Sequence, residues 1–264
     1  MSRVATTIEQ CRVDSAGALI GYLPLGFPDT STSIDAAVAL VENGVDILEL
    51  GVPYSDPVMD GIVIQRATQT ALHQGFRLRD TFVAVREISQ RVNAPILVMT
   101  YWNPVLQYGV NRFADDLREA RGAGLITPDL VPDEAQLWCA ESDRTGLDRV
   151  FLAAPTSSDV RLAQASASSR GFVYAVSTMG ITGARADVDQ AARALVNRLD
   201  AVGQTPACVG VGISTAAQVA EVLSYADGAI VGSALVAALA DGGVASVGSK
   251  ARELAQGKLL TSSV

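Results

Sequence analysis

Short apolar runs alternate with longer amphipathic segments along the whole chain, and this alternation constrains the fold more than any other feature. The runs are continuously apolar, as expected for strands that are covered on both faces of a parallel sheet. Eight strand–helix units in 264 residues predict a (β/α)8 TIM barrel, and an open doubly wound sheet is the alternative. The predicted strands are residues 18–25, 45–51, 94–101, 125–128, 149–153, 171–176, 207–212 and 228–231.

The segments between these runs have the apolar spacing of amphipathic helices. No linker or change in composition divides the chain, which predicts a single barrel domain over residues 1–264. We expect an N-terminal helix at about residues 3–15 and a C-terminal helical tail at about residues 244–260. The predicted helices between the strands are residues 31–43, 62–74, 78–92, 110–123, 133–143, 158–169, 187–201, 214–225 and 233–240.

Charge and composition argue against several classes of partner. The net charge is −8 and no basic cluster occurs, which argues against binding to nucleic acid or to an anionic membrane. The longest apolar stretch, residues 229–240, is too short to span a bilayer, and the N-terminus lacks the apolar core of a signal peptide. The three cysteines are odd in number and widely spaced, so they predict ordinary cytoplasmic thiols.

The scarcity of histidine and lysine restricts the chemistry. His73 is the one histidine and lies within a predicted helix, while Lys250 and Lys258 both lie near the C-terminus. An imine-forming lysine normally lies inside a fold, a zinc site commonly uses several histidines, and a Ser–His–Asp triad would depend on His73. The composition argues against all three and leaves carboxylates, tyrosines, hydroxyl groups and backbone amides.

Residues 49–61 combine a carboxylate inside an apolar run with two more on a proline-containing loop. Glu49 follows Val45 and Ile47 at the period of a strand, so its side chain shares their face. A carboxyl group in apolar surroundings has a raised pKa, and one that titrates near neutrality can both give and accept a proton. We therefore predict Glu49, facing the carboxylates of the loop, as an acid/base group.

Each carboxylate also has an alternative interpretation. Glu49 could be a structural residue that pairs with an arginine or with backbone amides. Asp60 directly precedes the predicted helix 62–74 and could cap it, and Asp56 could stabilise a turn. The three could instead bind Mg²⁺ through their oxygens, although we predict no metal site.

Three glycine-rich turns follow the sixth, seventh and eighth predicted strands, at residues 180–183, 210–214 and 232–233. Glycines let backbone amides approach an anion, and a helix N-terminus adds a favourable dipole. In barrels, phosphate is commonly bound by the loops after the seventh and eighth strands. The three turns together predict a phosphate site.

Two further features adjoin this predicted site. The long polar loop 177–187 is a candidate lid, and the alternative is a mobile connection. Tyr101 and Tyr174 stand at strand ends, where their hydroxyl groups could reach a cavity or their rings could belong to the core.

Several of these segments together resemble the tryptophan synthase alpha chain family. The resemblance runs in register over nearly the whole chain, and the string Glu-Leu-Gly-Val-Pro-Tyr-Ser-Asp-Pro at 49–57 is highly specific. Ile62 stands where the family usually has proline. The other matching segments are residues 22–28, 60–61, 177–183, 210–214 and 232–233.

The resemblance implies a (β/α)8 barrel lyase of tryptophan biosynthesis. Its reaction is the retro-aldol cleavage of indole-3-glycerol phosphate to indole and glyceraldehyde 3-phosphate. By motif match, Glu49 is the general acid/base, and Asp60 accepts from the indole N–H. Tyr22 matches an aromatic neighbour of the indole, Tyr174 a supporting tyrosine, and Thr182 the lid residue that approaches Asp60. The matched phosphate contacts are Gly183, Gly212, Gly232 and Ser233. Tyr101 is predicted to bind substrate from its place at a strand end.

The resemblance also implies a partner. Indole passes to a beta chain that carries pyridoxal phosphate, in an expected α2β2 heterotetramer, and this chain itself is expected to carry no cofactor. Pro53 and Asp56 match the surface that faces the beta chain. Two other functions stay open at this point: a different phosphate-binding barrel enzyme, such as an isomerase or a cyclase, and a regulatory partner with little activity alone.

Overall fold

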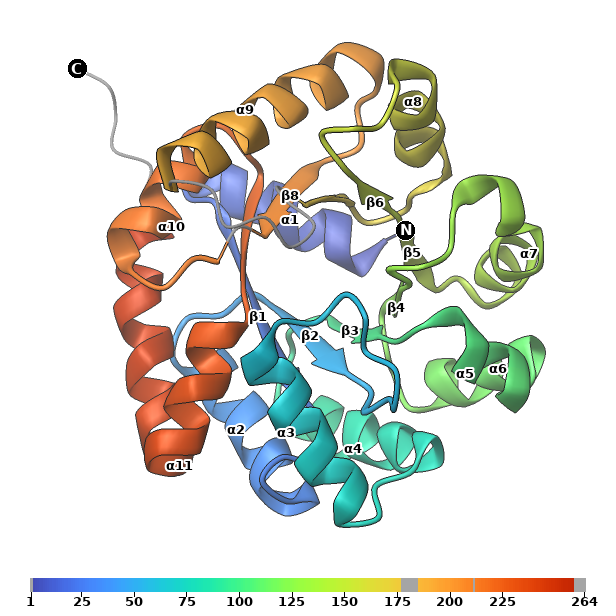
Figure 1. The fold of residues 1–264 in the computed structure, drawn as a ribbon, viewed down its shortest axis with the longest axis vertical. Helices are drawn as coiled ribbons and strands as arrows, with labels where there is room; N and C mark the ends of the chain where they lie inside the picture. Colours follow the sequence, from blue (N-terminus) through green and yellow to red (C-terminus); the bar gives the residue numbers. More distant parts are fainter. Residues whose placement is uncertain (1, 177–184, 211, 259–264) are drawn as a thin grey trace.

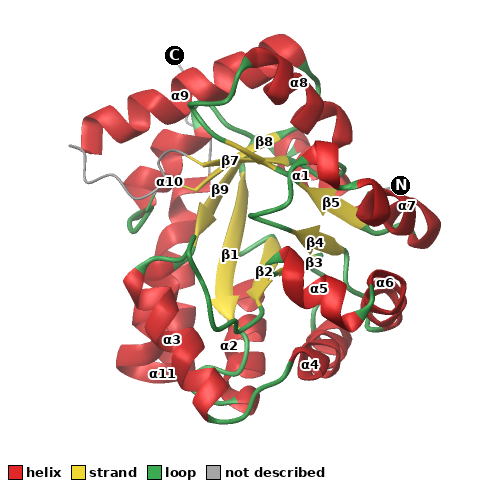
Figure 2. Cartoon of the chain, turned by 45° about the vertical axis from the view of Figure 1, so that its right-hand side comes forward, coloured by secondary structure: helices red, strands yellow, loops and turns green. Residues whose placement is uncertain are grey.

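Helices surround a central ring of strands (Figure 1, Figure 2). The computed structural model describes residues 2–176, 185–210 and 212–258. The strands are β1 (Ala18–Pro24), β2 (Ile47–Gly51), β3 (Ile96–Met99), β4 (Gly124–Ile126), β5 (Asp148–Val150), β6 (Leu152–Ala153), β7 (Val173–Val176), β8 (Ala207–Gly210) and β9 (Gly228–Val231).

All pairs between these strands are parallel, in the order β5-β4-β3-β2-β1-β9-β8-β7-β6. The two strands at the ends of this order, β5 and β6, are separated in the chain by Phe151 alone. The fifth predicted strand is therefore split in two, and the sheet closes almost completely around the barrel. The predicted (β/α)8 fold is confirmed, and the open doubly wound sheet is wrong.

The sequence pattern does not predict the short helix α5 (Trp102–Tyr108). Pro104 lies in its first turn, where a missing N–H costs no intrahelical hydrogen bond, so proline does not prevent the helix. The other helices are α1 (Arg3–Val13), α2 (Thr30–Glu42), α3 (Ile62–His73), α4 (Leu78–Arg91), α6 (Val110–Glu119), α7 (Gln136–Thr145), α8 (Asp159–Ser168), α9 (Arg185–Val202), α10 (Ala216–Leu223) and α11 (Ser233–Ala255). Short 3-10 turns lie at Pro132–Glu134 and Gln256–Lys258.

The long helix α11 is kinked at Gly242 and Gly243, the latter with φ of +64°. Beyond the kink, Gly248 lies against Ala39 of α2, and Arg252 donates to Asn43 Oδ1 at the end of that helix. Within the described residues, no helix is long and apolar enough to cross a membrane.

Helix α1 covers the end of the barrel at which the strands begin. Its apolar face, Val4, Ile8 and Cys11, is buried against side chains from inside the barrel. The inward-facing partners come from most of the strands and their flanks: Ala18, Ile20, Ile47, Leu97, Ala123, Ile126, Val150, Phe172, Cys208 and Ile230. The interior of the barrel is therefore filled with apolar side chains at this end, and the interior cavity that contains Glu49 lies at the other end.

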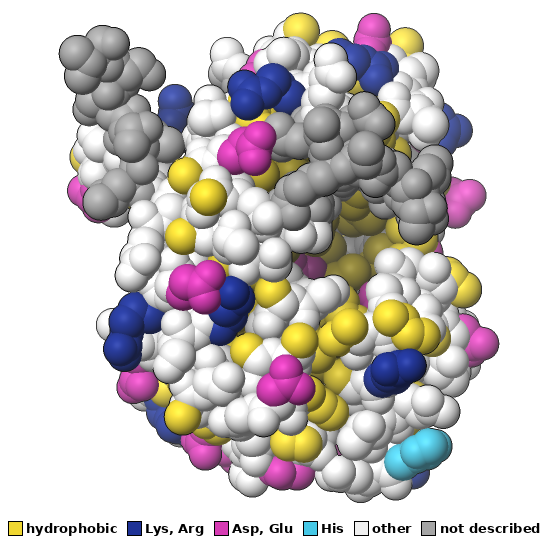
Figure 3. Space-filling view, turned by 60° about the vertical axis from the view of Figure 1, so that its left-hand side comes forward, with side chains coloured by type: hydrophobic (Ala, Val, Ile, Leu, Met, Phe, Trp, Pro, Cys, Tyr) yellow, Lys and Arg dark blue, Asp and Glu magenta, His cyan; other side chains and the backbone are white. Residues whose placement is uncertain are grey.

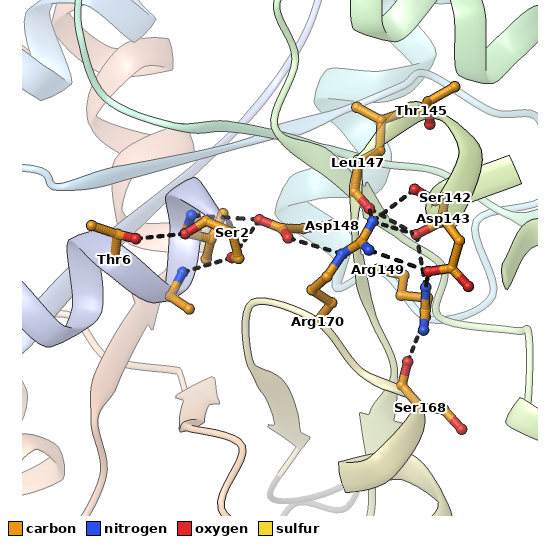
Figure 4. Close-up of polar contacts among 12 residues, drawn as sticks. Ser2, Thr6, Ser142, Asp143, Thr145, Leu147, Asp148, Arg149, Ser168 and Arg170 are labelled. Atoms are coloured by element: carbon orange, nitrogen blue, oxygen red, sulfur yellow. Dashed lines mark hydrogen bonds and ion pairs between the residues drawn. The ribbon is translucent and has the colours of Figure 1, made fainter.

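A polar cluster fixes the first residues of α1 to the start of β5 (Figure 4). Ser2 caps α1, and its Oγ donates to Asp148 Oδ2 at 2.8 Å, while the Val4 N–H approaches the same oxygen at 3.4 Å. Arg170 Nε lies 3.5 Å from Asp148 Oδ1. The Asp148 side chain is only 2% exposed, so water cannot replace these partners.

We expect Asp148→Asn to lower the free energy of unfolding by about 1–2 kcal/mol, because the amide keeps one acceptor oxygen in place of two and presents no charge to Arg170. Urea unfolding followed by circular dichroism measures this change. The matched control is Asp35→Asn at the exposed Asp35–Arg91 ion pair, where a loss below about 0.5 kcal/mol is expected. An equal loss in both variants would show that the α1 cluster adds no particular stability.

Candidate active site

A cavity opens at the C-terminal ends of the strands, on the side of the molecule that Figure 3 shows hollowed and lined by apolar side chains. An inner part of about 170 Å³ contains Glu49, and an adjoining part of about 490 Å³ extends toward Leu152 and Val176. Both are lined by Met59, Asp60, Gly61, Met99, Tyr174 and Gly210. Together they have a size typical of small-molecule sites.

Glu49 lies in this cavity, in register with Tyr22 of β1. The residue is 1% exposed, and its Oε2 has no hydrogen-bond partner among the described residues. Burial raises the pKa of Glu49 to about 8, and the negative charge of Asp60 adds to this effect. The alternative of a structural Glu paired with an arginine therefore finds no support among the described residues.

Asp60 belongs to the loop between β2 and α3. The predicted alternative, a helix cap, is wrong, because Gly61 is the N-cap of α3 and no side chain caps it. The Asp60 side chain instead lines the cavity, and burial raises its pKa to about 6. The cavity thus holds two carboxyl groups with different pKa values.

Tyr22 and Tyr174 lie on the cavity wall because neighbouring glycines leave room for their rings. The Tyr22 hydroxyl occupies the space that a Cβ at Gly51 would need, and its ring edge lies 3.3 Å from the Cβ position of Gly232. The Tyr174 hydroxyl lies 2.8 Å from the Cβ position of Gly210. In each pair, the tyrosine side chain packs over a glycine of the neighbouring strand, Gly51 of β2 or Gly210 of β8. A side chain at either glycine would collide with the tyrosine.

Tyr101 is placed differently from the other predicted tyrosines. Its hydroxyl accepts a hydrogen bond from the Met59 N–H at 2.9 Å, and its ring centroid lies 5.2 Å from that of Tyr54. It is not among the residues that line the cavity. The structure therefore places Tyr101 against the loop that carries Asp60.

The predicted phosphate residues lie at the far side of the inner cavity. Gly212, Gly232 and Ser233 line it, and Gly232 is the N-cap of α11. Backbone amides at this helix N-terminus favour an anion. The predicted contacts Thr182 and Gly183 lie outside the described residues, as does most of the predicted lid 177–187.

Sequence reasoning missed the apolar lining of the cavity. Met99 ends β3, a position that could have identified it, and Leu152 lies in the two-residue strand β6. Met59 lies on an irregular loop, where no pattern marks it. The missed apolar lining residues are Val58, Met59, Ile64, Met99, Pro128, Leu152, Val176 and Ile230.

The lysines and the histidine lie away from the cavity. Lys258 Nζ donates to Asp46 Oδ1 at 2.6 Å beside the start of β2, and Lys250 pairs with Glu253 on α11. His73 is exposed at the end of α3. Among the described residues, no group of three or more His, Cys, Asp or Glu is arranged to hold a metal ion.

Comparison with known proteins agrees with this geometry. The family model described as tryptophan synthase alpha chain matches residues 8–261. The tryptophan synthase alpha chain of Leifsonia xyli subsp. xyli is 72% identical over 257 residues, which are 97% of this chain and 98% of the relative. The chain belongs to the tryptophan synthase alpha chain family.

Solved tryptophan synthase structures have the same barrel. A Mycobacterium tuberculosis tryptophan synthase chain superimposes with a TM-score of 0.93 at 55% identity, covering 98% of this chain and 99% of that one. A chain of the tryptophan synthase complex from Pyrococcus furiosus gives 0.82 at 34% identity, covering 91% and 98%. The predicted lyase is confirmed by the family, and the isomerase and cyclase alternatives are wrong.

The contact between Tyr22 and Gly51 in this alpha chain can be tested by a double-mutant cycle. We expect Gly51→Ala to cost about 1–3 kcal/mol of stability, because its methyl group takes the place of the Tyr22 hydroxyl. In a Tyr22→Ala background, which also removes the ring carbons that lie 2.7 and 2.8 Å from the Cβ position of Gly51, the same change should cost clearly less. Urea unfolding of the four proteins measures the difference. Equal costs in both backgrounds would show that the two residues do not compete for this space.

Proposed function

We propose that this chain cleaves indole-3-glycerol phosphate in the cavity, with Glu49 as the general acid/base and Asp60 as the partner of the indole N–H. The observation that carries the proposal is the buried Glu49 carboxyl, whose Oε2 has no hydrogen-bond partner among the described residues and which faces Asp60. Without an imine-forming lysine or a metal, cleavage of a carbon–carbon bond needs the substrate itself to accept electrons. A protonated indole does so.

The two pKa values assign the roles. At neutral pH, Glu49 with a pKa of about 8 is mostly protonated, whereas Asp60 with a pKa of about 6 is mostly ionised. Glu49 therefore starts as the acid and delivers its proton to C3 of the indole. Asp60 accepts a hydrogen bond from the indole N–H and offsets the positive charge that develops on the ring.

Bond cleavage follows from the protonated intermediate. The Glu49 carboxylate takes the proton of the side-chain hydroxyl next to the scissile bond, and that oxygen becomes the aldehyde oxygen of glyceraldehyde 3-phosphate. The electron pair of the broken bond returns to the indole ring. Glu49 recovers the proton that it gave, so no co-reactant is consumed.

The remaining residues hold the substrate around this centre. The amides near Gly212, Gly232 and Ser233, with the N-terminus of α11, suit the phosphate. Tyr22 lies beside the expected indole, and Tyr174 supports the cavity wall near Glu49. Thr182 and Gly183 keep the roles that the family resemblance gives them, Gly183 at the phosphate and Thr182 near Asp60.

We propose a beta chain with pyridoxal phosphate as the recipient of the indole, in an α2β2 assembly in the cytoplasm. The Pyrococcus furiosus relative was solved as a tryptophan synthase complex, which supports such an assembly. Asp56 is exposed on the loop that carries Asp60 and is available for a partner. Pro53 is buried, so it would act on the interface by holding this loop in shape.

An indole-release assay on indole-3-glycerol phosphate, with and without a beta chain, tests this function. Glu49→Gln should lower kcat by about 10²–10⁴-fold, because the amide can neither give nor take the proton. Thermal unfolding should show that the variant stays folded, and exposed Glu87→Gln is the control with unchanged turnover. Turnover of Glu49→Gln close to that of the parent would contradict the assigned role.

The pH dependence of kcat/KM should be bell-shaped. Glu49 must be protonated, so activity falls as the pH rises through about 8, and Asp60 must be ionised, so activity falls as the pH drops through about 6. In Asp60→Asn, the pKa of Glu49 should fall because a nearby negative charge is removed. The alkaline limb of the pH profile of Asp60→Asn should therefore lie at a lower pH than in the parent protein. An alkaline limb at the same pH would show that the charge of Asp60 does not affect the pKa of Glu49.

A further inference from the structure

Two side chains outside the reaction itself hold the backbone around Asp60. Tyr101 Oη accepts from the Met59 N–H at 2.9 Å, and Gln65 Nε2 donates to the Asp60 carbonyl oxygen at 2.7 Å. Tyr101 binds the amide of the residue before Asp60, and Gln65 binds the carbonyl group of Asp60 itself. The short segment that carries the carboxylate is therefore fixed at both of its ends.

Little else attaches this part of the loop to the barrel. Among the described residues, the other hydrogen bonds within 55–60 are internal, such as Val58 N–H to Asp56 O at 2.9 Å and Asp60 N–H to Pro57 O at 3.0 Å. A further weak contact, from Gln65 Nε2 to Pro57 O at 3.5 Å, again involves Gln65. Val58 is 81% exposed, so packing does not hold the loop at its outer side.

The two anchors are themselves well fixed. Tyr101 is 6% exposed, its ring contacts Tyr54, and the following Trp102 N–H donates to both oxygens of Asp129 at 2.9 and 3.1 Å. Gln65 lies near the start of α3, where its own N–H donates to the Gly61 carbonyl at 2.9 Å. Tyr101, which follows β3 as the N-cap of α5, and helix α3 thus hold the loop from two directions.

We propose that Tyr101 and Gln65 are positioning residues for the cleavage reaction, which act by fixing Asp60 where it meets the indole N–H. This inference rests on the proposed role of Asp60. Tyr101 then acts through the Met59 amide and not by direct contact with substrate. Asp129 acts indirectly, because its carboxylate accepts from the Trp102 N–H and so fixes the backbone next to Tyr101.

Tyr101→Phe tests the proposal because it removes the hydroxyl and keeps the ring. The Met59 amide should exchange with solvent deuterium faster, as measured by hydrogen exchange, since it loses its acceptor. The value of kcat/KM should fall by about three- to tenfold, the equivalent of one neutral hydrogen bond. The lower pH limit of activity should move from about 6 toward the ordinary aspartate value of 3.8, because a released Asp60 is less buried.

Tyr108→Phe is the matched control. It removes a tyrosine hydroxyl that binds Asp116 on α6, away from the cavity, so Met59 exchange and the pH limits should stay unchanged. Gln65→Met is the second variant and removes the other anchor with similar volume. If both anchors act through Asp60, the double variant should lose less than the product of the two single losses.

Two results would overturn the proposal: unchanged Met59 exchange in Tyr101→Phe, or faster exchange with the lower pH limit still at about 6. Asp60→Asn separates this inference from the proposed function. If Asp60→Asn retains full activity, the assigned role of Asp60 fails whatever Tyr101→Phe shows. If Asp60→Asn is inactive and Tyr101→Phe behaves as the parent protein, only the positioning role fails.

Discussion

The buried carboxyl of Glu49 is the constraint on which the rest of the site depends. A carboxylate in such surroundings is costly, so the group stays protonated to a higher pH than an exposed glutamate. The burial that makes the charged form unfavourable also raises the pKa of Glu49 toward neutrality. A carboxyl group that titrates near neutrality can both donate and accept a proton. The barrel provides the stability that permits it.

The two ends of the barrel divide these tasks. At the end where the strands begin, α1 and the inward-facing apolar side chains fill the interior, and Ser2, Asp148 and Arg170 fix the helix in place. At the other end, glycines such as Gly51 and Gly210 keep space open, and tyrosine rings occupy part of it. Packing and reactivity thus lie at opposite ends of the same strands, as is usual for this architecture.

Asp60 differs from Glu49 in how it is held. Glu49 is positioned by a central strand whose neighbours fix its register, whereas Asp60 lies on a loop with an exposed outer side. A loop residue can be placed accurately only if specific contacts fix its backbone, and the bonds from Tyr101 and Gln65 do this. The same loop carries exposed Asp56, so the partner surface and the reacting centre share one short segment.

Periodicity and composition are local properties of the chain, so the sequence alone predicts the strand–helix order, the burial of Glu49 and the scarcity of lysine and histidine for chemistry. It could not show that the fifth strand splits at Phe151 or that α5 forms, since short elements depend on their neighbours. It assigned Asp60 and Tyr101 ambiguously. The packed fold shows that Asp60 does not cap α3 and that the Tyr101 hydroxyl accepts a hydrogen bond from the Met59 amide, because both depend on contacts between separate segments. The pKa values of both carboxyl groups likewise depend on burial, which arises when segments far apart in the sequence pack together.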